Sequence, residues 1–533
     1  MAETKRWYQT TAIDYPNSRP HIGTAFEKLG ADVQARYRRM EGYDVFFLMG
    51  NDENTTKVAD RAKALNRDVQ EYCDDMATQF KEVWKALDIS FDAFEQTSHA
   101  RHKAACAKFI QKVYDNGHIY KDEYAGWYCN DCEEFKSDKL HTENAGDCPV
   151  HKKPLVRRSE PCWLFRLSSF TGQLLAFYAE HPDFIQPESR KNEIIGLIQA
   201  EGLRDINISR LGESWGIPIP FDPEFTIYVW FDALLTYISG IGYGDDESMF
   251  AKYWPADLHF IGKDITRFHV ALWPAMCWAA GIEPPRKVFG HGFVTFAGDK
   301  IGKSRTEELK AKGLDYLLEP MTIIEKFSAE GFRYYFLREC PYPGDGEISP
   351  DQFIKVFNTD LSNKLGNLLS RCLTVGATNF GGVFDGTAGT TPAPVSAEFE
   401  AAKVVDVVRG HVESCSYNLA LDVIIQNVVT PANQFLDLNA PWKLVKTGEP
   451  ADKERAKGVI VQAVEHLRIA AILLKPFLPN SAKTIYESFA FDVPWNAVTY
   501  ADAAARIPFA TDLRITAQLI EGKPKVLFPR IAG

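Results

Sequence analysis

Four potential metal ligands are grouped in two short segments, WYCNDC and GDCPVH. Cys129 and Cys132 form the first pair, and Cys148 and His151 form the second. Each pair can hold one side of a tetrahedral ion, and three thiolates with one imidazole suit zinc. Because four protein ligands leave no open position, we expect a structural zinc, one per chain, that stabilises its module by about 10 kcal/mol. The alternative is four reduced side chains in an irregular loop.

Two further motifs could bind phosphate. In RPHIGT, a proline-led turn brings His21 and Gly23 to the expected start of a helix. Backbone N–H groups and the positive end of the helix dipole attract phosphate there, and His21 could donate another hydrogen bond. In DKIGKS, Lys300 and Lys303 could neutralise charge as pyrophosphate leaves. Each motif alone has an ordinary alternative, a simple turn or a solvated basic loop. Their order around one α/β region favours a nucleotide site.

The residues around these motifs alternate between strand and helix patterns. Residues 6–13 and 44–50 are predicted strands, and residues 23–40 have apolar side chains at helical spacing. Such a strand–helix–strand unit implies a parallel sheet. The predicted regions are two halves of a split α/β nucleotide-binding domain at 1–118 and 226–295, an insertion with the zinc knuckle at 119–225, a linker with KIGKS at 296–350, a helical domain at 351–510, and a tail folding back on the body at 511–533.

Length and composition agree with this division. The chain has 533 residues, whereas single cores stop growing at roughly 250–300 residues. Its longest apolar run, VALWPAMCWAAGI, is too short to span a bilayer, and the charged start MAETKRW does not resemble a signal peptide. We therefore expect a cytoplasmic protein with no membrane partner. Cysteines outside the knuckle, such as Cys106 and Cys372, lie in helical patterns and are expected in the core.

Over nearly its whole length the chain resembles the methionyl-tRNA synthetases, a family of class I aminoacyl-tRNA synthetases. The similar segments, in the family's order, are TTAIDYPNSRPHIGT, GNDENTTKVADRA, the zinc knuckle, NISRLGESWGIPIP, YVWFDALLTY, HFIGKDITRFH, KIGKS, DLSNKLGNLLSR and NAPWKL. The resemblance implies a Rossmann-like parallel-sheet catalytic domain with a zinc-binding connective insertion, followed by an all-α anticodon-binding domain. It also implies that methionine and ATP form methionyl-adenylate, whose acyl group passes to the terminal ribose of methionine tRNA.

The resemblance also implies particular site residues. For ATP and its chemistry they are His21, Gly23, Thr24, Gly262, Asp264, Lys300, Lys303 and Ser304, with magnesium accompanying ATP. For methionine they are Ile13, Tyr15, Asp52, Trp230, Ala233, Tyr237 and His269, with Asp52 on the substrate ammonium. For the tRNA anticodon they are Asn367, Arg371 and Trp442. Aromatic walls suit a polarizable thioether, and an unstacked base can lie on a tryptophan ring. Without the resemblance, the same residues could be aromatic core, a helix cap or other structural side chains.

The chain departs from the family pattern at four places. Thr24 replaces a histidine, and its hydroxyl can donate to phosphate but is never cationic. If this weakens one hydrogen bond to the transition state by about 1–3 kcal/mol, the reaction slows roughly ten- to a hundred-fold. Ile301 and Gly302 stand where Met-Ser is usual, and RTEELK follows Ser304 where Leu-Gly-Asn is usual. Asp14 lies between two expected pocket residues, where the family is apolar or aromatic. If Asp14 faces the pocket, it could favour a more polar amino acid.

Three functions are compatible with these observations. The first is a working methionyl-tRNA synthetase, which the retained knuckle, Asp52 and anticodon residues favour. The second is a related ligase that adenylates an amino acid and hands it to a small-molecule acceptor, for which the altered loops and Asp14 are the motive. The third is a non-catalytic tRNA-binding protein, which would have little need of both lysines. The family's optional C-terminal dimerisation module is not visible after KVLFP, so we expect a monomer.

Overall fold

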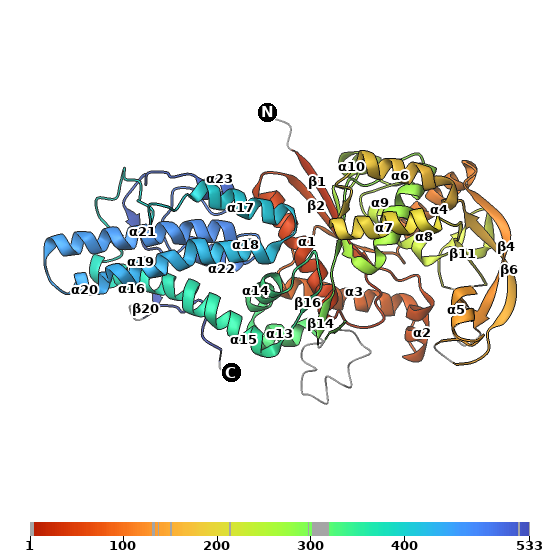
Figure 1. Ribbon diagram of the computed structural model, residues 1–533, viewed down its shortest axis with the longest axis horizontal. Coiled ribbons are helices and arrows are strands. Elements are labelled where there is room, and N and C mark those ends of the chain that lie inside the picture. Colours follow the sequence, from red (N-terminus) through yellow and green to blue (C-terminus); the bar gives the residue numbers. More distant parts are fainter. Residues whose placement is uncertain are drawn as a thin grey trace.

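The computed structural model describes residues 5–129, 134–136, 138–149, 152–212, 215–296, 298–300, 319–520 and 523–531. A helical domain and a long antiparallel hairpin lie at opposite ends of the molecule, and a parallel sheet with its helices lies between them (Figure 1). No helix in these ranges is both long and apolar enough to cross a membrane.

The central sheet has six strands in the order β3-β2-β1-β12-β13-β7, and every neighbouring pair is parallel. The strands are β1 (Arg6–Thr11), β2 (Asp44–Asn51), β3 (Ala93–Gln96), β7 (Ile185–Gln186), β12 (Leu258–Gly262) and β13 (Val288–His291). Because β1 pairs with β12, about half the chain separates two adjacent strands, as expected for a split domain. The strand order reverses between β1 and β12, and ligands of open α/β sheets bind outside the carboxyl ends of strands at such a point.

The predicted strand–helix–strand unit is confirmed with small shifts of its bounds. Strand β1 ends at Thr11, and helix α1 (Ile22–Met40) begins after a ten-residue loop, so the RPHIGT motif spans the end of the loop and the first turn of the helix. Phe47 and Met49 of β2 pack in the core shared with α1 and α3 (Val69–Ala86), whereas Leu48 packs in the core on the other face. This alternation is the period of two expected for a strand buried on both faces.

The insertion begins after helix α4 (Ala100–Asp115) with the long hairpin of β4 (Ile119–Cys129) and β6 (Val156–Phe165) (Figure 1). Its other elements are β5 (Glu134–Lys136), α5 (Asp138–Glu143), η1 (Leu167–Phe170), α6 (Thr171–Glu180), α7 (Glu188–Glu201), β8 (Ile206–Asn207), β9 (Ser209–Leu211), β10 (Pro218–Ile219) and β11 (Asp222–Ile227). Strand β7 also lies in this part of the sequence, yet it joins the parallel sheet beside β13. Two residues are too few to show a strand period, so the sequence did not reveal it.

The second half of the catalytic region supplies short helices around the sheet. Helix α2 (Thr56–Ala64) belongs to the first half. The elements of the second half and of the region that follows it are α8 (Val229–Ala233), α9 (Thr236–Ser239), α10 (Glu247–Tyr253), η2 (Lys263–Ile265), η3 (Phe268–Leu272), α11 (Trp273–Ala279), β14 (Val294–Phe296), β15 (Asp299–Lys300), α13 (Pro320–Phe327), α14 (Ala329–Glu339) and β16 (Gly346–Glu347). Strands β15 and β14 pair antiparallel, so the KIGKS motif starts at the edge of a small separate sheet.

The helical domain packs around α21 (Pro450–Leu474), which is buried almost continuously in its second half. The other elements are α15 (Pro350–Val356), η6 (Phe357–Gly366), α16 (Asn367–Phe380), β17 (Val383–Phe384), α17 (Ala401–Glu413), α18 (Tyr417–Val423), η7 (Ile424–Val429), α19 (Thr430–Asn439), α20 (Pro441–Leu444), α22 (Pro479–Tyr486), α23 (Tyr500–Ala504), β18 (Leu513–Arg514), β19 (Leu519–Ile520) and β20 (Lys523–Pro524). Pro431 lies in the first turn of α19, a position at which proline is tolerated, directly after the wider π-helical segment η7.

A buried ion pair links the catalytic region to the helical domain. Arg333 of α14 is fully buried, and one of its guanidinium nitrogens lies 2.8 Å from Asp32 of α1. The same guanidinium donates to the carbonyls of Pro476 and Phe477, which follow α21. The C-terminal tail returns to the body, since Asn358 exchanges hydrogen bonds with Ile531. The segment KVLFP (525–529) lies in this tail and is not a strand, since β20 (Lys523–Pro524) ends directly before it.

Candidate active site

The start of α1 is closed by the side chain of His21. Its Nδ1 accepts hydrogen bonds from the backbone N–H groups of Gly23 (3.0 Å) and Thr24 (3.4 Å). Because Nδ1 accepts, the proton of a neutral imidazole lies on Nε2, which is thereby a donor. A Cβ at position 23 would lie 2.9 Å from the imidazole, so the glycine is what allows this cap to form. The predicted helix start is therefore confirmed in detail.

Thr24 completes the cap rather than extending toward the cavity. Its hydroxyl donates to the His21 carbonyl (2.7 Å) and accepts from the His21 N–H (3.0 Å), which makes a reciprocal capping box. The hydroxyl proton is thus used within the helix end. A contact between Thr24 and phosphate stays a prediction, and it would require this bond to be exchanged.

A cavity of about 300 Å³ lies at the carboxyl ends of β1 and β12, where the strand order reverses. Of the residues that the resemblance implied for ATP and methionine, the lining includes Ile13, Tyr15, His21, Gly23, Thr24, Gly262 and Asp264. These residues come from sequence positions up to about 250 apart, and the structure brings them to one cavity. Its position agrees with the general rule for ligand sites of open α/β sheets.

A buried group of charges lies under this cavity, and sequence reasoning missed most of it. The ammonium of Lys28 is fully buried and lies 2.7 Å from Glu27 and 3.0 Å from Asp14. The second carboxylate oxygen of Glu27 lies 3.2 Å from Nε2 of His291. Asp14 lines the cavity, so its side chain does face the site, but it is already paired with Lys28.

Burial and the charges in this group shift the pKa values of Asp14 and Glu27 in opposite directions. Burial raises the pKa of Asp14 to about 6, although Lys28 opposes the shift. Burial acts in the same direction on Glu27, but Lys28 and His291 outweigh it and hold the pKa of Glu27 at about 2. A lysine on an amphipathic helix usually indicates the solvent face, which is why the sequence did not predict this cluster.

Asp52 is a buried carboxylate that lacks a full set of partners. It follows β2 directly and is 3% exposed. Among the described residues, none hydrogen-bonds its Oδ1 atom. Burial, followed by the nearby charges of Asp232 and Glu53, raises its pKa well above the ordinary value. A buried charge without a partner is costly, and a bound cation would compensate it.

Two tyrosines of the predicted pocket lie within reach of the charge of Asp52. Burial is the main cause of the raised pKa of Tyr15, followed by the charge of Asp52. For Tyr237, burial is followed by the charges of Glu27, Asp14 and then Asp52.

The Tyr237 hydroxyl lies 2.7 Å from Nε2 of His269. The Nδ1–H of His269 donates to the Ile265 carbonyl at 3.0 Å, because a carbonyl oxygen can only accept. The Nε2 atom of a neutral ring therefore accepts from the Tyr237 hydroxyl.

The predicted pocket residues Trp230, Ala233, Tyr237 and His269 lie on α8, α9 and η3 and are not among the residues that line the cavity at the carboxyl ends of β1 and β12. Trp230 of α8 stacks on Phe268, with ring centres 3.9 Å apart and planes 4° apart. Ala233 is buried one turn later. Burial lowers the pKa of His269 to about 4, so its imidazole is neutral at physiological pH. Phe268 was not predicted, although it directly precedes His269 in the motif ITRFH.

Half of the zinc knuckle lies within the described residues. Cys129 ends β4, and Cys148 follows α5; both are buried in one small cluster with Leu155. This common location fits two ligands of one ion. Cys132 and His151 lie outside the described residues, and so do Lys303 and Ser304 of the KIGKS motif, while Lys300 ends β15.

The predicted anticodon residues gather on one face of the helical domain. Asn367 is exposed at the start of α16, and Arg371 lies one turn later. The Arg371 guanidinium lies 4.5 Å from the ring centre of Trp442 in α20, and it forms an ion pair with Asp437. A half-buried planar pair of this kind is a surface on which an unstacked base can lie.

Comparison with known proteins agrees with this geometry. The family of class I tRNA synthetases (M) matches residues 7–155 and 143–373, and the anticodon binding domain of methionyl tRNA ligase matches residues 398–531. The chain is 40% identical over 491 residues to a methionine–tRNA ligase of Caldanaerobacter subterraneus subsp. tengcongensis, covering 91% of this chain and 74% of the relative. It is 37% identical over 538 residues to that of a Nostoc species, covering 99% and 97%.

The fold is also shared with a solved structure. Mycobacterium tuberculosis methionyl-tRNA synthetase in complex with methionyl-adenylate superposes with a TM-score of 0.85 at 35% identity, covering 99% of this chain and 100% of that one. The apo form of the same enzyme superposes with a TM-score of 0.80 at 34% identity. The sequence-based expectation is confirmed: the chain belongs to the methionine–tRNA ligase family of class I tRNA synthetases.

Proposed function

We propose that this methionine–tRNA ligase activates methionine in the cavity at the carboxyl ends of β1 and β12. The observation that carries the assignment of roles is Asp52, buried and with one oxygen that no described residue hydrogen-bonds. The substrate ammonium would supply the missing charge. The aromatic residues of α8 and α9 beside it suit a polarizable thioether.

In the first step, an oxygen of the methionine carboxylate attacks the α-phosphorus of ATP. The bond from this phosphorus to the bridging oxygen breaks, and pyrophosphate leaves with the electron pair. The Nε2–H of His21 would bind a phosphate oxygen, because Nδ1 is the acceptor within the cap and the proton of a neutral ring lies on Nε2. The N–H groups of Gly23 and Thr24 would bind phosphate by exchanging their bonds to His21. Lys300 and Lys303 would neutralise the charge of the departing group. Magnesium bound with ATP would add positive charge at the phosphates.

In the second step, a hydroxyl of the terminal ribose of methionine tRNA attacks the carbonyl carbon of the adenylate. The new ester keeps the acyl group, AMP leaves with the electron pair, and the hydroxyl proton is released. Asn367, Arg371 and Trp442 would hold the anticodon, with a base on the Trp442 ring. The match of the helical domain to an anticodon-binding family supports this role and leaves the small-molecule alternative without support.

The knuckle would hold one structural zinc on Cys129, Cys132, Cys148 and His151. The shared burial of Cys129 and Cys148 supports this set. Metal analysis of protein purified without chelator should find about one zinc per chain, reduced by Cys129→Ser. Protein that folds with no zinc would contradict the site. A cytoplasmic location and a monomeric state stay predictions, which fractionation and sedimentation would test.

The proposed roles are tested by ATP–pyrophosphate exchange driven by each amino acid in turn. Methionine should drive exchange far better than glycine, alanine or glutamate, since each missing methylene costs about 1–3 kcal/mol.

Lys303→Ala should reduce exchange by orders of magnitude with little loss of methionine binding. Trp442→Ala should leave exchange unchanged and depress tRNA charging. Exchange driven best by another amino acid would contradict the pocket assignment and make Asp14 the first residue to mutate.

A further inference from the structure

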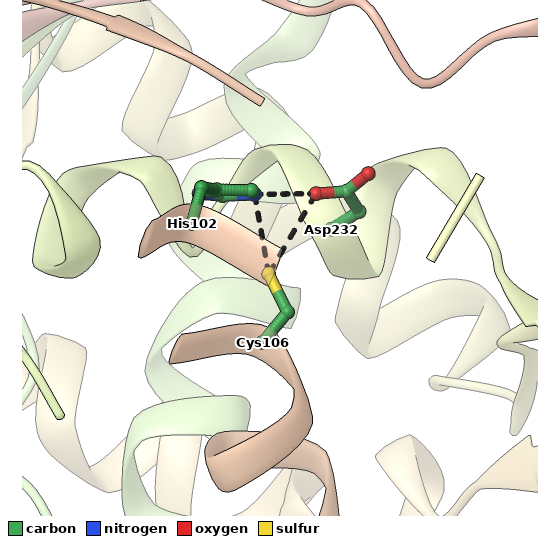
Figure 2. Close-up of side chains that lie close together, drawn as sticks. All are labelled: His102, Cys106 and Asp232. Atoms are coloured by element: carbon green, nitrogen blue, oxygen red, sulfur yellow. Dashed lines mark hydrogen bonds and ion pairs between the residues drawn. The ribbon is translucent and has the colours of Figure 1, made fainter. Parts of the chain in front are cut away.

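Three side chains behind the amino-acid site form a buried polar cluster that the proposed chemistry does not use (Figure 2). His102 and Cys106 lie one turn apart on α4, and Asp232 lies on α8; all three are fully buried. Nε2 of His102 lies 2.6 Å from Oδ1 of Asp232 and 3.1 Å from the Cys106 sulfur. The cluster therefore joins two elements that are distant in sequence at a point close to Asp52.

The geometry of the cluster is that of a hydrogen-bond network. Ligand atoms around a tetrahedral zinc stand roughly 3.3 Å apart, whereas the His102 nitrogen and the Asp232 oxygen are only 2.6 Å apart. In a nucleophilic triad the acid and the nucleophile bind opposite nitrogens of the histidine. Here both Asp232 and Cys106 contact the same nitrogen, and burial raises the pKa of Cys106, which keeps the thiol protonated.

His102 holds Asp232 in a defined orientation. The Nδ1 atom of His102 lies 2.8 Å from the Ser239 hydroxyl and accepts from it, so the Nε2–H donates to Oδ1 of Asp232. The other carboxylate oxygen, Oδ2, accepts from the side-chain amide of Asn54 at 2.9 Å. Asp232 is therefore held from both sides, by α4 and by the segment that follows β2.

The same Asn54 amide fixes the segment that carries Asp52. It donates to the Thr97 carbonyl at 2.9 Å as well as to Asp232, and the backbone N–H of Glu53 donates to the Thr97 hydroxyl at 2.8 Å. Asp52 lies two residues before Asn54. After burial, the charge of Asp232 is the largest cause of the raised pKa of Asp52. Asp232 is thus linked through Asn54 to the segment that carries Asp52, and its charge contributes to the field at Asp52.

We propose that His102 is a positioning residue for recognition of the substrate amino group, acting through Asp232 and Asn54 on Asp52. The proposal rests on Asp52 as the ammonium-binding residue. Without His102, Asp232 would lose a buried charge-assisted bond and would reorient, and the Asn54 segment that carries Asp52 would move with it. The site would then bind the ammonium group less tightly, while its contacts with the thioether would stay in place.

A matched pair of ligands separates this role from a merely structural one. The full-length protein is titrated with L-methioninol and with the same alcohol lacking its amino group. His102→Leu should weaken binding of methioninol about 10–100-fold and leave the deaminated alcohol unaffected. His102→Gln, which keeps a donor near the position of Nε2, should restore part of the preference for the amino group. Cys106→Ala, which of the bonds to Asp232 removes only the longer thiol contact with Oδ1 (3.7 Å), should have a smaller effect.

Two further variants keep the test decisive. Asp52→Asn should abolish the preference; if it does not, the assignment of Asp52 fails independently of His102. If His102→Leu does not fold, Ser239→Ala removes the bond to Nδ1 and a long contact with the Thr236 carbonyl (3.5 Å), and it should lower the preference less strongly. The proposal would be overturned if the His102 variants lost binding of both alcohols equally. It would also be overturned if these variants kept the preference for the amino group while Asp52→Asn abolished it.

Discussion

Two buried aspartates of the catalytic region have opposite surroundings. At the domain junction, the carboxylate of Asp32 lies 2.8 Å from Arg36, 2.8 Å from Arg333, and 2.6 Å from the Ser90 hydroxyl. Although burial opposes it, these partners lower the pKa of Asp32 to about 2. In the amino-acid site, burial and acidic neighbours raise the pKa of Asp52 well above its ordinary value.

The different surroundings of Asp32 and Asp52 indicate that the first charge maintains the fold and the second is available to a ligand. Asp32 has its cations within the chain, so its charge contributes to holding two domains together. Asp52 has acids for neighbours and an oxygen that no described residue hydrogen-bonds, so its charge is uncompensated until a cation binds. Stability at one aspartate and function at the other should therefore be separable by mutation.

The largest expected effect on stability is at the junction. Arg333→Met removes one of two cations from Asp32 and the donors to the carbonyls of Pro476 and Phe477. The free energy of unfolding should fall by about 3–5 kcal/mol. Urea denaturation measures this, with Arg204→Met, at an exposed arginine, as a control. If Arg333→Met were as stable as the control, the junction pair would not be the stabilising one.

Acid should separate the two aspartates. The folded pKa of Asp32 lies below its unfolded value, so its contribution is present above about pH 4 and is lost as pH falls toward 2. That contribution is on the order of 2 kcal/mol and should be absent from the pH profile of Asp32→Asn. The raised pKa of Asp52 acts with the opposite sign, since ionisation of Asp52 destabilises the ligand-free protein as pH rises. The stabilisation by added methionine should accordingly grow with pH until Asp52 is fully ionised.

A smaller effect is expected at the aromatic side of the pocket. Tyr237→Phe removes the hydroxyl that donates to His269, a net loss of about 0.5–1.5 kcal/mol. The KM for methionine in exchange should rise roughly two- to ten-fold, and the KM for ATP should not change. An equal rise of both values would show that Tyr237 is not specific to the amino-acid pocket.

The smallest effect is expected at the start of α1. Thr24→His should be neutral or faster in adenylate formation, because a cationic donor is added near the phosphates. It should also cost about 1 kcal/mol of stability, since the capping box with His21 is lost. Thr24→Ser, which keeps the hydroxyl, is the control. Strong inactivation by Thr24→His would mean that the threonine is fitted to this site rather than tolerated.

Sequence patterns predicted the parts of the molecule that depend on local spacing. The strand β1, the helix α1 and the turn at His21 were found because their periods and capping residues lie within a few positions of one another. The pocket residues required the family resemblance, since nothing local distinguishes Trp230 or Tyr237 from aromatic core.

Contacts between distant segments could not be predicted in this way. His102 and Asp232 are 130 positions apart, and either one alone has the pattern of an ordinary helix residue. Lys28 has the pattern of a surface lysine, and its burial follows only from Asp14 and Glu27 being placed around it by β1 and α1. The two-residue strand β7 is too short to have a period at all.

The most direct test of the central claim compares Asp52→Asn with Asp32→Asn, measuring methionine-dependent ATP–pyrophosphate exchange and urea denaturation on both proteins. Asp52→Asn should lower kcat/KM for methionine by about two to three orders of magnitude, the loss expected when a buried ion pair of about 3–5 kcal/mol is broken. It should leave stability unchanged or raised. Asp32→Asn should do the reverse, with a clear loss of stability and normal exchange per folded molecule. Normal exchange by Asp52→Asn, or a loss of stability as large as that of Asp32→Asn, would contradict the assignment of Asp52 to the substrate.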